Sequence, residues 1–258
     1  MKALIGYTGF VGGNLLKQIS FDELYNSKNI SDIRGKSFET IICAGAPAVK
    51  WYANKHPEED FNTISSLIEN LKQVTCDEFI LISTVDVYNS PLNINENTPV
   101  DLNTLQAYGK NRLMLEQFVQ TNFKNSIIIR LPGLFGEGLK KNIIYDFLHN
   151  NNIDQIDSRN IFQFYNLNQL YKDIETCREH SLKVVNFATE PTSVRELISF
   201  AFSIDFTNEL NNPLVNYDMQ TIHNAYFDKN IPYLASKLEV LEDVKNFVEI
   251  ERGKTLWS

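Results

Sequence analysis

The sequence is poor in the residues that build disulfide frameworks, fibrous chains and metal clusters. Its 258 residues include only 3 cysteines, 11 glycines and 8 prolines. The cysteines, Cys43, Cys76 and Cys177, are an odd number without CxxC spacing, so we expect neither a disulfide framework nor a zinc site. The 4 histidines are scattered without helical pairing. We therefore predict reduced thiols and no metal cofactor.

Basic residues are outnumbered, and long apolar runs are missing. There are 24 Lys and Arg against 32 Asp and Glu, which gives a formal charge of −8. Without a concentrated basic patch, nucleic acid is not an expected partner. No apolar run is long enough to cross a bilayer, and the one after Met1 and Lys2 is too short for a signal peptide. We expect a soluble, cytoplasmic protein that does not bind membranes.

What the sequence does contain is an alternation of strand and helix patterns. Short apolar runs predict strands at 3–5, 23–25, 39–44, 78–83, 126–131 and 184–187. Helical spacing predicts helices at 11–19, 60–74, 108–119 and 238–250, and another that starts at Ser193 with a capping box to Glu196. Phe61, Ile64, Leu67, Ile68 and Leu71 are expected on the apolar side of the 60–74 helix. The pattern indicates an α/β fold with a doubly wound, Rossmann-like parallel sheet.

The same pattern divides the chain into two parts. We expect a dinucleotide-binding domain at 1–135, joined by a returning segment near 160–190. Residues 136–160 and 190–258 are expected to form a small substrate lobe over the carboxyl ends of the strands, where such sheets bind ligands.

A glycine-rich turn follows the first predicted strand. Gly6, Gly9 and Gly12 stand three residues apart, with Phe10 and Val11 opening the next helix. Such glycines let the backbone approach a pyrophosphate near free amides. The alternative is a tight turn without a ligand, but the strand–turn–helix context favours a dinucleotide site.

Hydroxyl groups and one cation follow later in the chain. Thr84 and Asp86 come directly after a buried strand, and Tyr108 and Arg112 are four residues apart on one helical face. We expect Arg112 to lower the pKa of the Tyr108 phenol. Thr84 would hold the substrate oxygen that exchanges a proton with Tyr108. Asp86 is either a further acid/base or a solvated turn residue.

Together these motifs resemble the extended short-chain dehydrogenase/reductases, the NAD-dependent epimerase/dehydratase group. The resemblance spans most of the chain through its motifs and their order, which are the glycine turn, Ala44-Gly45-Ala46, Asn62, Thr84 with Val87-Tyr88, Tyr108, Arg130 to Gly136, Asn186 and Ser193 to Leu197.

The resemblance implies a nicotinamide cofactor and a nucleotide-linked sugar as substrate. It implies that Tyr108 is the acid/base and Thr84 its hydrogen-bonding partner. Asp86 aligns with a glutamate that acts as acid/base in sugar dehydratases. The resemblance further implies a homodimer through the helices before and after the Tyr108 motif. The implied cofactor contacts include Ala44, Gly45, Ala46, Ser83, Arg112, Pro132, Gly133 and Leu134.

Two departures from the family pattern bear on activity and cofactor choice. Arg112 stands where the family has lysine, and an arginine cannot release a proton. Catalysis has therefore either been retained with Tyr108 and Thr84, or been lost while dinucleotide binding remains. At the end of the second strand, Asn26, Ser27 and Lys28 replace the usual acid, which favours NADP over NAD unless this is an ordinary polar loop.

The region between this strand and the next is short, so the usual second helix and third strand are expected to be truncated. Gln163 to Gln169 replaces paired acids with amides, which keep a structural role. Lys140, Lys141, Asn142 and Arg195 are the expected contacts to the substrate. The sequence thus predicts an NAD(P)-dependent oxidoreductase, epimerase or dehydratase of nucleotide-linked sugars. The alternative is a non-catalytic dinucleotide-binding sensor or partner subunit.

Overall fold

The chain forms two compact units, each built from several segments. The computed structural model describes residues 1–255. The first unit consists of 1–90, 96–131 and 170–186, and the second of 91–95, 132–169 and 187–258. The segment of the second unit that starts at Pro132 lies four residues before the substrate lobe expected from the sequence, because residues 133–135 form a strand that pairs within the second unit.

One parallel sheet is the basis of the first unit. Its strands are β1 (Lys2–Ile5), β2 (Glu23–Tyr25), β3 (Ser37–Cys43), β4 (Thr75–Thr84), β6 (Ser126–Leu131) and β10 (Val184–Asn186). They lie in the order β10-β6-β4-β3-β1-β2, and every neighbouring pair is parallel. Strand β6 is buried along its whole length, as a parallel sheet covered on both faces requires.

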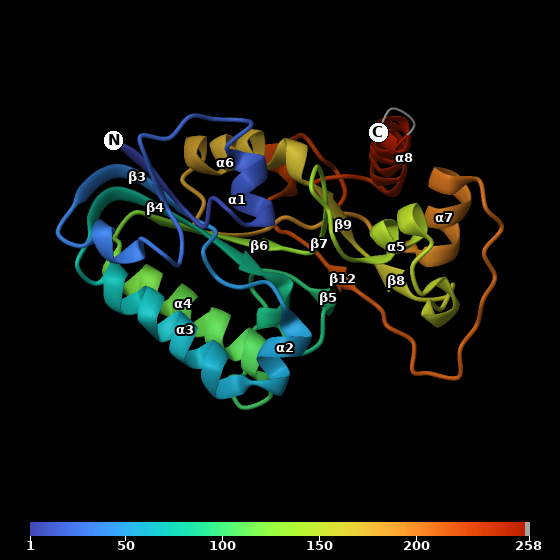
Figure 1. The fold of residues 1–258 in the computed structure, drawn as a ribbon, viewed down its shortest axis with the longest axis horizontal. Helices are drawn as coiled ribbons and strands as arrows, with labels where there is room; N and C mark the ends of the chain where they lie inside the picture. Colours follow the sequence, from blue (N-terminus) through green and yellow to red (C-terminus); the bar gives the residue numbers. More distant parts are fainter. Residues whose placement is uncertain (256–258) are drawn as a thin grey trace. The chain divides into compact units, whose positions relative to one another are not determined.

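Helices cover both faces of this sheet, which confirms the doubly wound α/β fold. They are α1 (Phe10–Leu15), α2 (Lys50–Lys55), α3 (Pro57–Leu71), α4 (Ala107–Asn122) and α6 (Leu170–Glu179). Figure 1 shows α3 and α4 side by side on one face and α1 and α6 on the other.

The apolar side of α3 differs from the expectation at one position. Ile64, Leu67 and Leu71 are buried against the sheet, but Phe61 is 47% exposed. The residue that turns inward in this part of α3 is Asp60, which forms a buried ion pair with Arg112. An inward Asp60 directs its neighbour Phe61 toward the surface, because successive helical residues point about 100° apart.

Strand β2 lies at the edge of the sheet, and the chain leaves it through a short segment. The 3-10 helix η1 (Ile30–Ile33) leads directly into β3 on the opposite side of β1. The predicted loss of the second helix and third strand is therefore confirmed. The strand order reverses beside β1, and in open α/β sheets ligands bind outside the carboxyl ends of the strands at this point.

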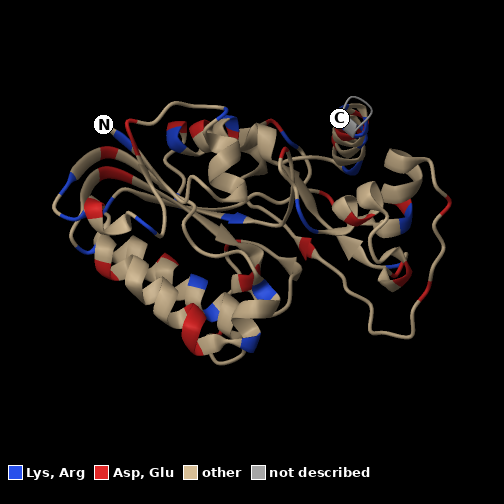
Figure 2. Cartoon of the chain, in the orientation of Figure 1, with Lys and Arg blue, Asp and Glu red and all other residues tan. Residues whose placement is uncertain are grey.

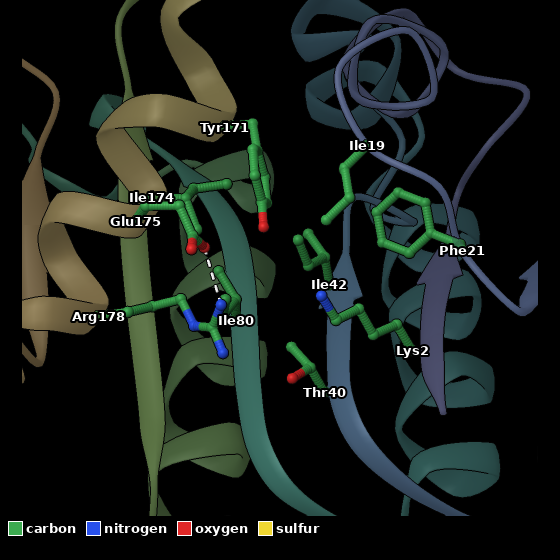
Figure 3. A pocket seen from close by; sticks show the side chains of 10 residues that line it. All are labelled: Lys2, Ile19, Phe21, Thr40, Ile42, Ile80, Tyr171, Ile174, Glu175 and Arg178. Atoms are coloured by element: carbon green, nitrogen blue, oxygen red, sulfur yellow. Dashed lines mark hydrogen bonds and ion pairs between the residues drawn. The ribbon is translucent and has the colours of Figure 1, made fainter.

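A small pocket lies where α6 packs on the sheet. Figure 3 shows apolar side chains around it, including Ile19, Ile42, Ile80 and Ile174, with Thr40 at its floor. The Thr40 hydroxyl is buried and has no hydrogen-bond partner among the described residues. Lys2, the first residue of β1, also lines the pocket.

The second unit is made of short strand pairs and three helices. Strand β5 (Leu92–Ile94) pairs with β12 (Asp218–Met219), β7 (Gly133–Phe135) with β9 (Phe164–Asn166), and β8 (Ile161–Phe162) with β11 (Thr192–Ser193). The helices are α5 (Ile143–His149), α7 (Val194–Phe202) and α8 (Lys237–Thr255). Their apolar sides share one core with residues such as Phe147, Leu197 and Val244.

Several local predictions are confirmed in these elements. Ser193 and Glu196 form the capping box at the start of α7. Strand β10 returns to the sheet beside β6.

Cys43, Cys76 and Cys177 are free thiols. Within residues 1–255, no helix has the length and apolarity needed to cross a membrane. The remaining 3-10 helices are η2 (Val85–Val87), η3 (Ile153–Gln155), η4 (Leu167–Gln169) and η5 (Asn224–Phe227).

Candidate active site

The glycine turn after β1 is packed backbone against backbone. Gly6 has a φ of +87°, and a Cβ on it would lie 2.3 Å from the carbonyl oxygen of Ala44 at the end of β3. A Cβ on Gly12 would lie 2.2 Å from the Gly6 oxygen. Gly9 is the N-cap of α1, and no side chain caps that helix. The turn therefore leaves backbone groups without side-chain cover at the carboxyl end of β1, which fits a dinucleotide pyrophosphate.

The end of β2 is organised by amides rather than by an acid. Asn26 donates from Nδ2 to the Tyr7 hydroxyl at 3.1 Å and accepts from the Lys28 backbone N–H at 2.8 Å. Glu23, the one acid in β2, is held by the Lys36 ammonium at 2.7 Å. The hydrogen bonds from Lys36 and Tyr25 hold the pKa of Glu23 below its usual value. The strand end, residues 26–29, thus presents neutral side chains and one exposed lysine.

Thr84, Asp86 and Tyr108 meet at the carboxyl end of β4. The Thr84 hydroxyl oxygen accepts from the Asp86 backbone N–H at 3.2 Å, which starts η2. Thr84 also lies near enough to the Tyr108 phenol to lower its pKa. A Cβ on Gly109 would lie 2.0 Å from the Asp86 carbonyl oxygen, so glycine at this position lets the first turn of α4 pack on η2. The fold therefore brings together Thr84 and Tyr108, which are 24 residues apart in the sequence.

Arg112 stacks on Tyr108 but spends its donors elsewhere. Its guanidinium carbon lies 4.0 Å from the centre of the Tyr108 ring. Nη1 pairs with Asp60 of α3, and Nη2 donates to the Pro47 carbonyl oxygen at 2.5 Å. Asp60 also accepts from Asn111 at 2.7 Å. The pair is buried in the first turn of α3, where Figure 2 shows acidic residues gathered.

The predicted depression of the Tyr108 pKa is overturned. Burial of the phenol, which is 7% exposed, raises its pKa above the usual value. Arg112 and Thr84 lower the pKa but do not outweigh burial. The prediction considered only the neighbouring cation, whereas desolvation disfavours a buried phenolate.

Two residues of α2 also contact the site, and the sequence did not predict either. Lys50 forms an ion pair with Asp86, with 2.6 Å between Nζ and Oδ1. The Asn54 side-chain oxygen accepts from the Tyr108 backbone N–H at 3.0 Å, which caps the start of α4. Only their i, i+4 spacing on one helical face could have linked them, and that spacing is common.

Ser83 and Tyr88 belong to a second polar group, which is built around Glu116 of α4 and Arg130 of β6. The Ser83 hydroxyl donates to Glu116, which is held by Arg130 of β6 at 2.6 Å. Arg130 also donates to the Tyr88 hydroxyl at 2.7 Å. The side chain of Ser83, an expected cofactor contact, thus hydrogen-bonds within the protein.

The expected cofactor and substrate residues after β6 belong to the second unit. Pro132 precedes β7, and Gly133 and Leu134 lie in that strand, whose close pairing puts a Gly133 Cβ 2.8 Å from the Gln163 oxygen. Asn142 caps α5 and donates to the Leu134 oxygen at 2.8 Å, so its amide serves the fold. Desolvation lowers the pKa of Lys141.

The other substrate candidate and the amide run are settled locally. Arg195 is 60% exposed and lies 3.5 Å from Asp205. The buried Gln163 side chain accepts from the Met219 N–H at 2.8 Å and donates to the Met219 carbonyl at 2.7 Å. The structural role expected for this amide is confirmed. Among the described residues, no group of His, Cys, Asp and Glu is arranged to hold a metal ion.

The NAD dependent epimerase/dehydratase family model matches residues 23–171. The chain belongs to this family. The match contains Thr84, Tyr108 and Arg112 and begins after the glycine turn. The family resemblance expected from the motifs is therefore confirmed. No curated protein matches the sequence.

Solved structures with this fold extend over the whole chain. MoeE5 in complex with UDP-glucose and NAD is 14% identical with a TM-score of 0.75, covering 98% of this chain and 99% of that one. UDP-glucose 4-epimerase from Thermotoga maritima is 15% identical with a TM-score of 0.72, covering 99% and 100%. A dTDP-4-dehydrorhamnose reductase from Yersinia enterocolitica is 16% identical with a TM-score of 0.70, covering 96% and 98%. Similarity at this level shows the Rossmann-like fold.

Proposed function

We propose that this member of the family is an enzyme that binds a nicotinamide dinucleotide and acts on a nucleotide-linked sugar as an epimerase, dehydratase or reductase. The observation that carries the proposal is the placement of Tyr108 beside Thr84 at the carboxyl edge of β4, where the first turn of α4 packs on η2. The glycine turn lies in the same unit, at the carboxyl end of β1. The solved structures with UDP-glucose support this substrate class.

The chain's own groups would handle the proton. Tyr108 would hold or accept the proton of the sugar hydroxyl at its phenol oxygen, and Thr84 would orient that oxygen. The bound nicotinamide would supply or accept the hydride. The burial that raises the Tyr108 pKa favours the phenol, which is the form that donates a proton to a ketone. Asp86, next to both hydroxyl groups, is a second candidate acid/base.

The proposed cofactor site follows the carboxyl edge of the sheet. Gly6, Gly9, Phe10, Val11 and Gly12 would face the pyrophosphate, with Ala44, Gly45 and Ala46 beside them at the end of β3. Because Asn26, Ser27 and Lys28 offer no carboxylate, a ribose 2′-phosphate would be accepted as well as a diol. We therefore propose NADP as the slightly preferred cofactor, with NAD also bound.

A fluorescence titration with NADH and NADPH tests the cofactor proposal. We expect micromolar binding, and Lys28→Glu should weaken NADPH several-fold while leaving NADH nearly unchanged. Gly12→Ala and Gly13→Ala form a matched pair, because a Cβ meets the Gly6 oxygen at 2.2 Å in the first and only the Tyr7 oxygen at 3.8 Å in the second. Gly12→Ala should lose most cofactor affinity. If neither nucleotide binds near millimolar concentration, the proposal is wrong.

The second candidate is a non-catalytic dinucleotide-binding module, and the position of Arg112 favours it. Both terminal nitrogens of Arg112 serve Asp60 and Pro47, which leaves less of this side chain for ribose than the sequence implied. Turnover of UDP-glucose in the presence of NAD, and its loss in Tyr108→Phe, separates the two. Substrate contacts from Lys141 and Arg195, and a homodimer through α3 and α4, are further parts of the proposal; light scattering measures the dimer.

A further inference from the structure

The ion pair between Lys50 and Asp86 lies near Tyr108, the proposed acid/base. Asp86 Oδ1 lies 2.6 Å from the Lys50 ammonium, and Oδ2 lies 3.4 Å from the Thr84 hydroxyl oxygen. Thr84 in turn lies near Tyr108, because the first turn of α4 packs on η2. A chain of polar side chains therefore extends from beside the buried phenol to a charged pair. The Asp86 side chain is 20% exposed and that of Lys50 is 46% exposed, so this chain reaches solvent.

The other cation near Tyr108 is placed differently. Arg112 lies over the face of the ring, and its terminal nitrogens contact Asp60, Pro47 and the Tyr108 carbonyl. It is 3% exposed and cannot exchange a proton with solvent. A buried, fixed arginine can set the charge near the ring, but it cannot respond to a change at the phenol oxygen.

We propose that Lys50 is a positioning residue of the acid/base site, which neutralises the Asp86 carboxylate beside Tyr108 and supplies the exposed cation that Arg112 does not provide. The proposal rests on the acid/base role of Tyr108 in the proposed function. It assigns a task to a second residue of α2, in addition to Asn54, which caps the start of α4.

Charge balance gives the proposal its direction. The charged groups that act on Tyr108 are Asp86 of η2, Arg112 of α4 and Lys50 of α2, while Asp60 of α3 faces Arg112. Asp86 raises the Tyr108 pKa, and Lys50 lowers it. Without Lys50, Asp86 would stand as an uncompensated negative charge near the phenol, and the phenolate would become harder to form.

The test reads the ionisation of Tyr108 without cofactor or substrate. Tyr108 is replaced by 3-fluorotyrosine, whose phenol is more acidic, and its single fluorine signal is followed by NMR as pH rises. In Lys50→Gln the midpoint should rise by about half a pH unit or more. Lys50→Arg should restore the midpoint, because it keeps the cation. Lys55→Gln removes a charge at the far end of the same helix and should leave the midpoint unchanged.

A second arm asks whether Lys50 acts through Asp86. In an Asp86→Asn background the effect of Lys50→Gln should shrink to less than half. A Lys50→Gln midpoint equal to that of Lys55→Gln would overturn the proposal, and so would a shift that persists in full without Asp86. Circular dichroism at each pH confirms that the variants remain folded. If the ionisation midpoints shift as expected but the wild-type protein turns over no substrate, the proposed function is wrong and the role of Lys50 beside Tyr108 stands, so the two failures are distinguishable.

Discussion

The first unit contains two buried groups of the same composition, an arginine stacked on a tyrosine and paired with a carboxylate. In one group, Arg130 lies over Tyr88 at 4.9 Å and binds Glu116. In the other, Arg112 lies over Tyr108 at 4.0 Å and binds Asp60. Both arginines are under a tenth exposed, and both carboxylates are buried.

The two groups differ in what the arginine does with the tyrosine hydroxyl. Arg130 donates to the Tyr88 hydroxyl at 2.7 Å and uses Nε and Nη2 on Glu116, so all its nitrogens are bound. Arg112 donates instead to Asp60, to the Tyr108 carbonyl and to the Pro47 carbonyl, and its Nε has no partner among the described residues. A closed network holds a fold together, whereas a hydroxyl outside such a network remains able to meet a ligand.

The largest effect should separate the two tyrosines by activity. Tyr108→Phe removes the proposed acid/base group and should lower turnover by about 100- to 10,000-fold, because this is the usual contribution of general acid–base catalysis. Tyr88→Phe should keep most activity and instead lose about 1 kcal/mol of unfolding free energy with its hydrogen bonds. Initial rates with NAD and UDP-glucose, beside chemical denaturation, measure both. Equal losses of activity would erase the distinction between the two groups.

The next effect concerns the carboxylates and should make the groups look alike. Glu116→Ala and Asp60→Ala each leave a buried arginine without its counter-charge, which costs about 3 to 5 kcal/mol. We expect Glu116→Ala to be the more destabilising, because Glu116 accepts from two nitrogens of Arg130 and from Ser83, whereas Asp60 accepts from one nitrogen of Arg112 and from Asn111. Urea unfolding with the exposed Glu69→Ala as control provides the comparison. A loss below 1 kcal/mol at either site would show that the pair is not desolvated in solution.

Replacing each arginine by lysine should sharpen the difference again. A lysine offers one charged nitrogen and no planar fork, so Arg130→Lys breaks three bonded nitrogens and should cost about 2 kcal/mol more than a surface change. Arg112→Lys loses fewer contacts because Nε is already without a partner, and we expect about half that cost. Thermal unfolding of both variants decides the order, and the reverse order would contradict this account of the networks.

The sequence predicted more of the fold than of the site. The sequence pattern predicted the bounds of β2 and β6 to the residue, and it predicted the capping box at Ser193. Local burial and local hydrogen bonding decide those features. The short stretch before β3 correctly predicted the missing helix. Motif spacing also brought Thr84 and Tyr108 together.

What the sequence could not predict depends on contacts between distant segments. The carboxylate partner of Arg112 comes from α3 and that of Lys50 from η2, 52 and 36 residues away. The burial that raises the Tyr108 pKa likewise depends on packing by several elements. The same reason explains why periodicity predicts Phe61 on the buried side of α3. Periodicity indicates the apolar side of a helix but not the buried ion pair that Asp60 forms in its first turn.

The smallest effect tests whether burial, and not pairing alone, gives the two groups their strength. Glu239 at the start of α8 pairs with Lys229 at 2.5 Å and accepts from the Ser236 N–H at 2.8 Å, yet it is 49% exposed. These contacts, the Lys229 bond first, lower its pKa to about 2. A lowered carboxyl pKa stabilises the fold above the pKa of the unfolded chain, and this stabilisation is lost as pH falls through the folded value. Glu239→Gln should therefore cost under about 1 kcal/mol at pH 7, because solvent screens an exposed pair. The difference between wild type and variant in denaturant titrations should shrink between pH 4.5 and about 2. A cost near that of Glu116→Ala would mean that pairing, rather than desolvation, sets the energies of all three carboxylates.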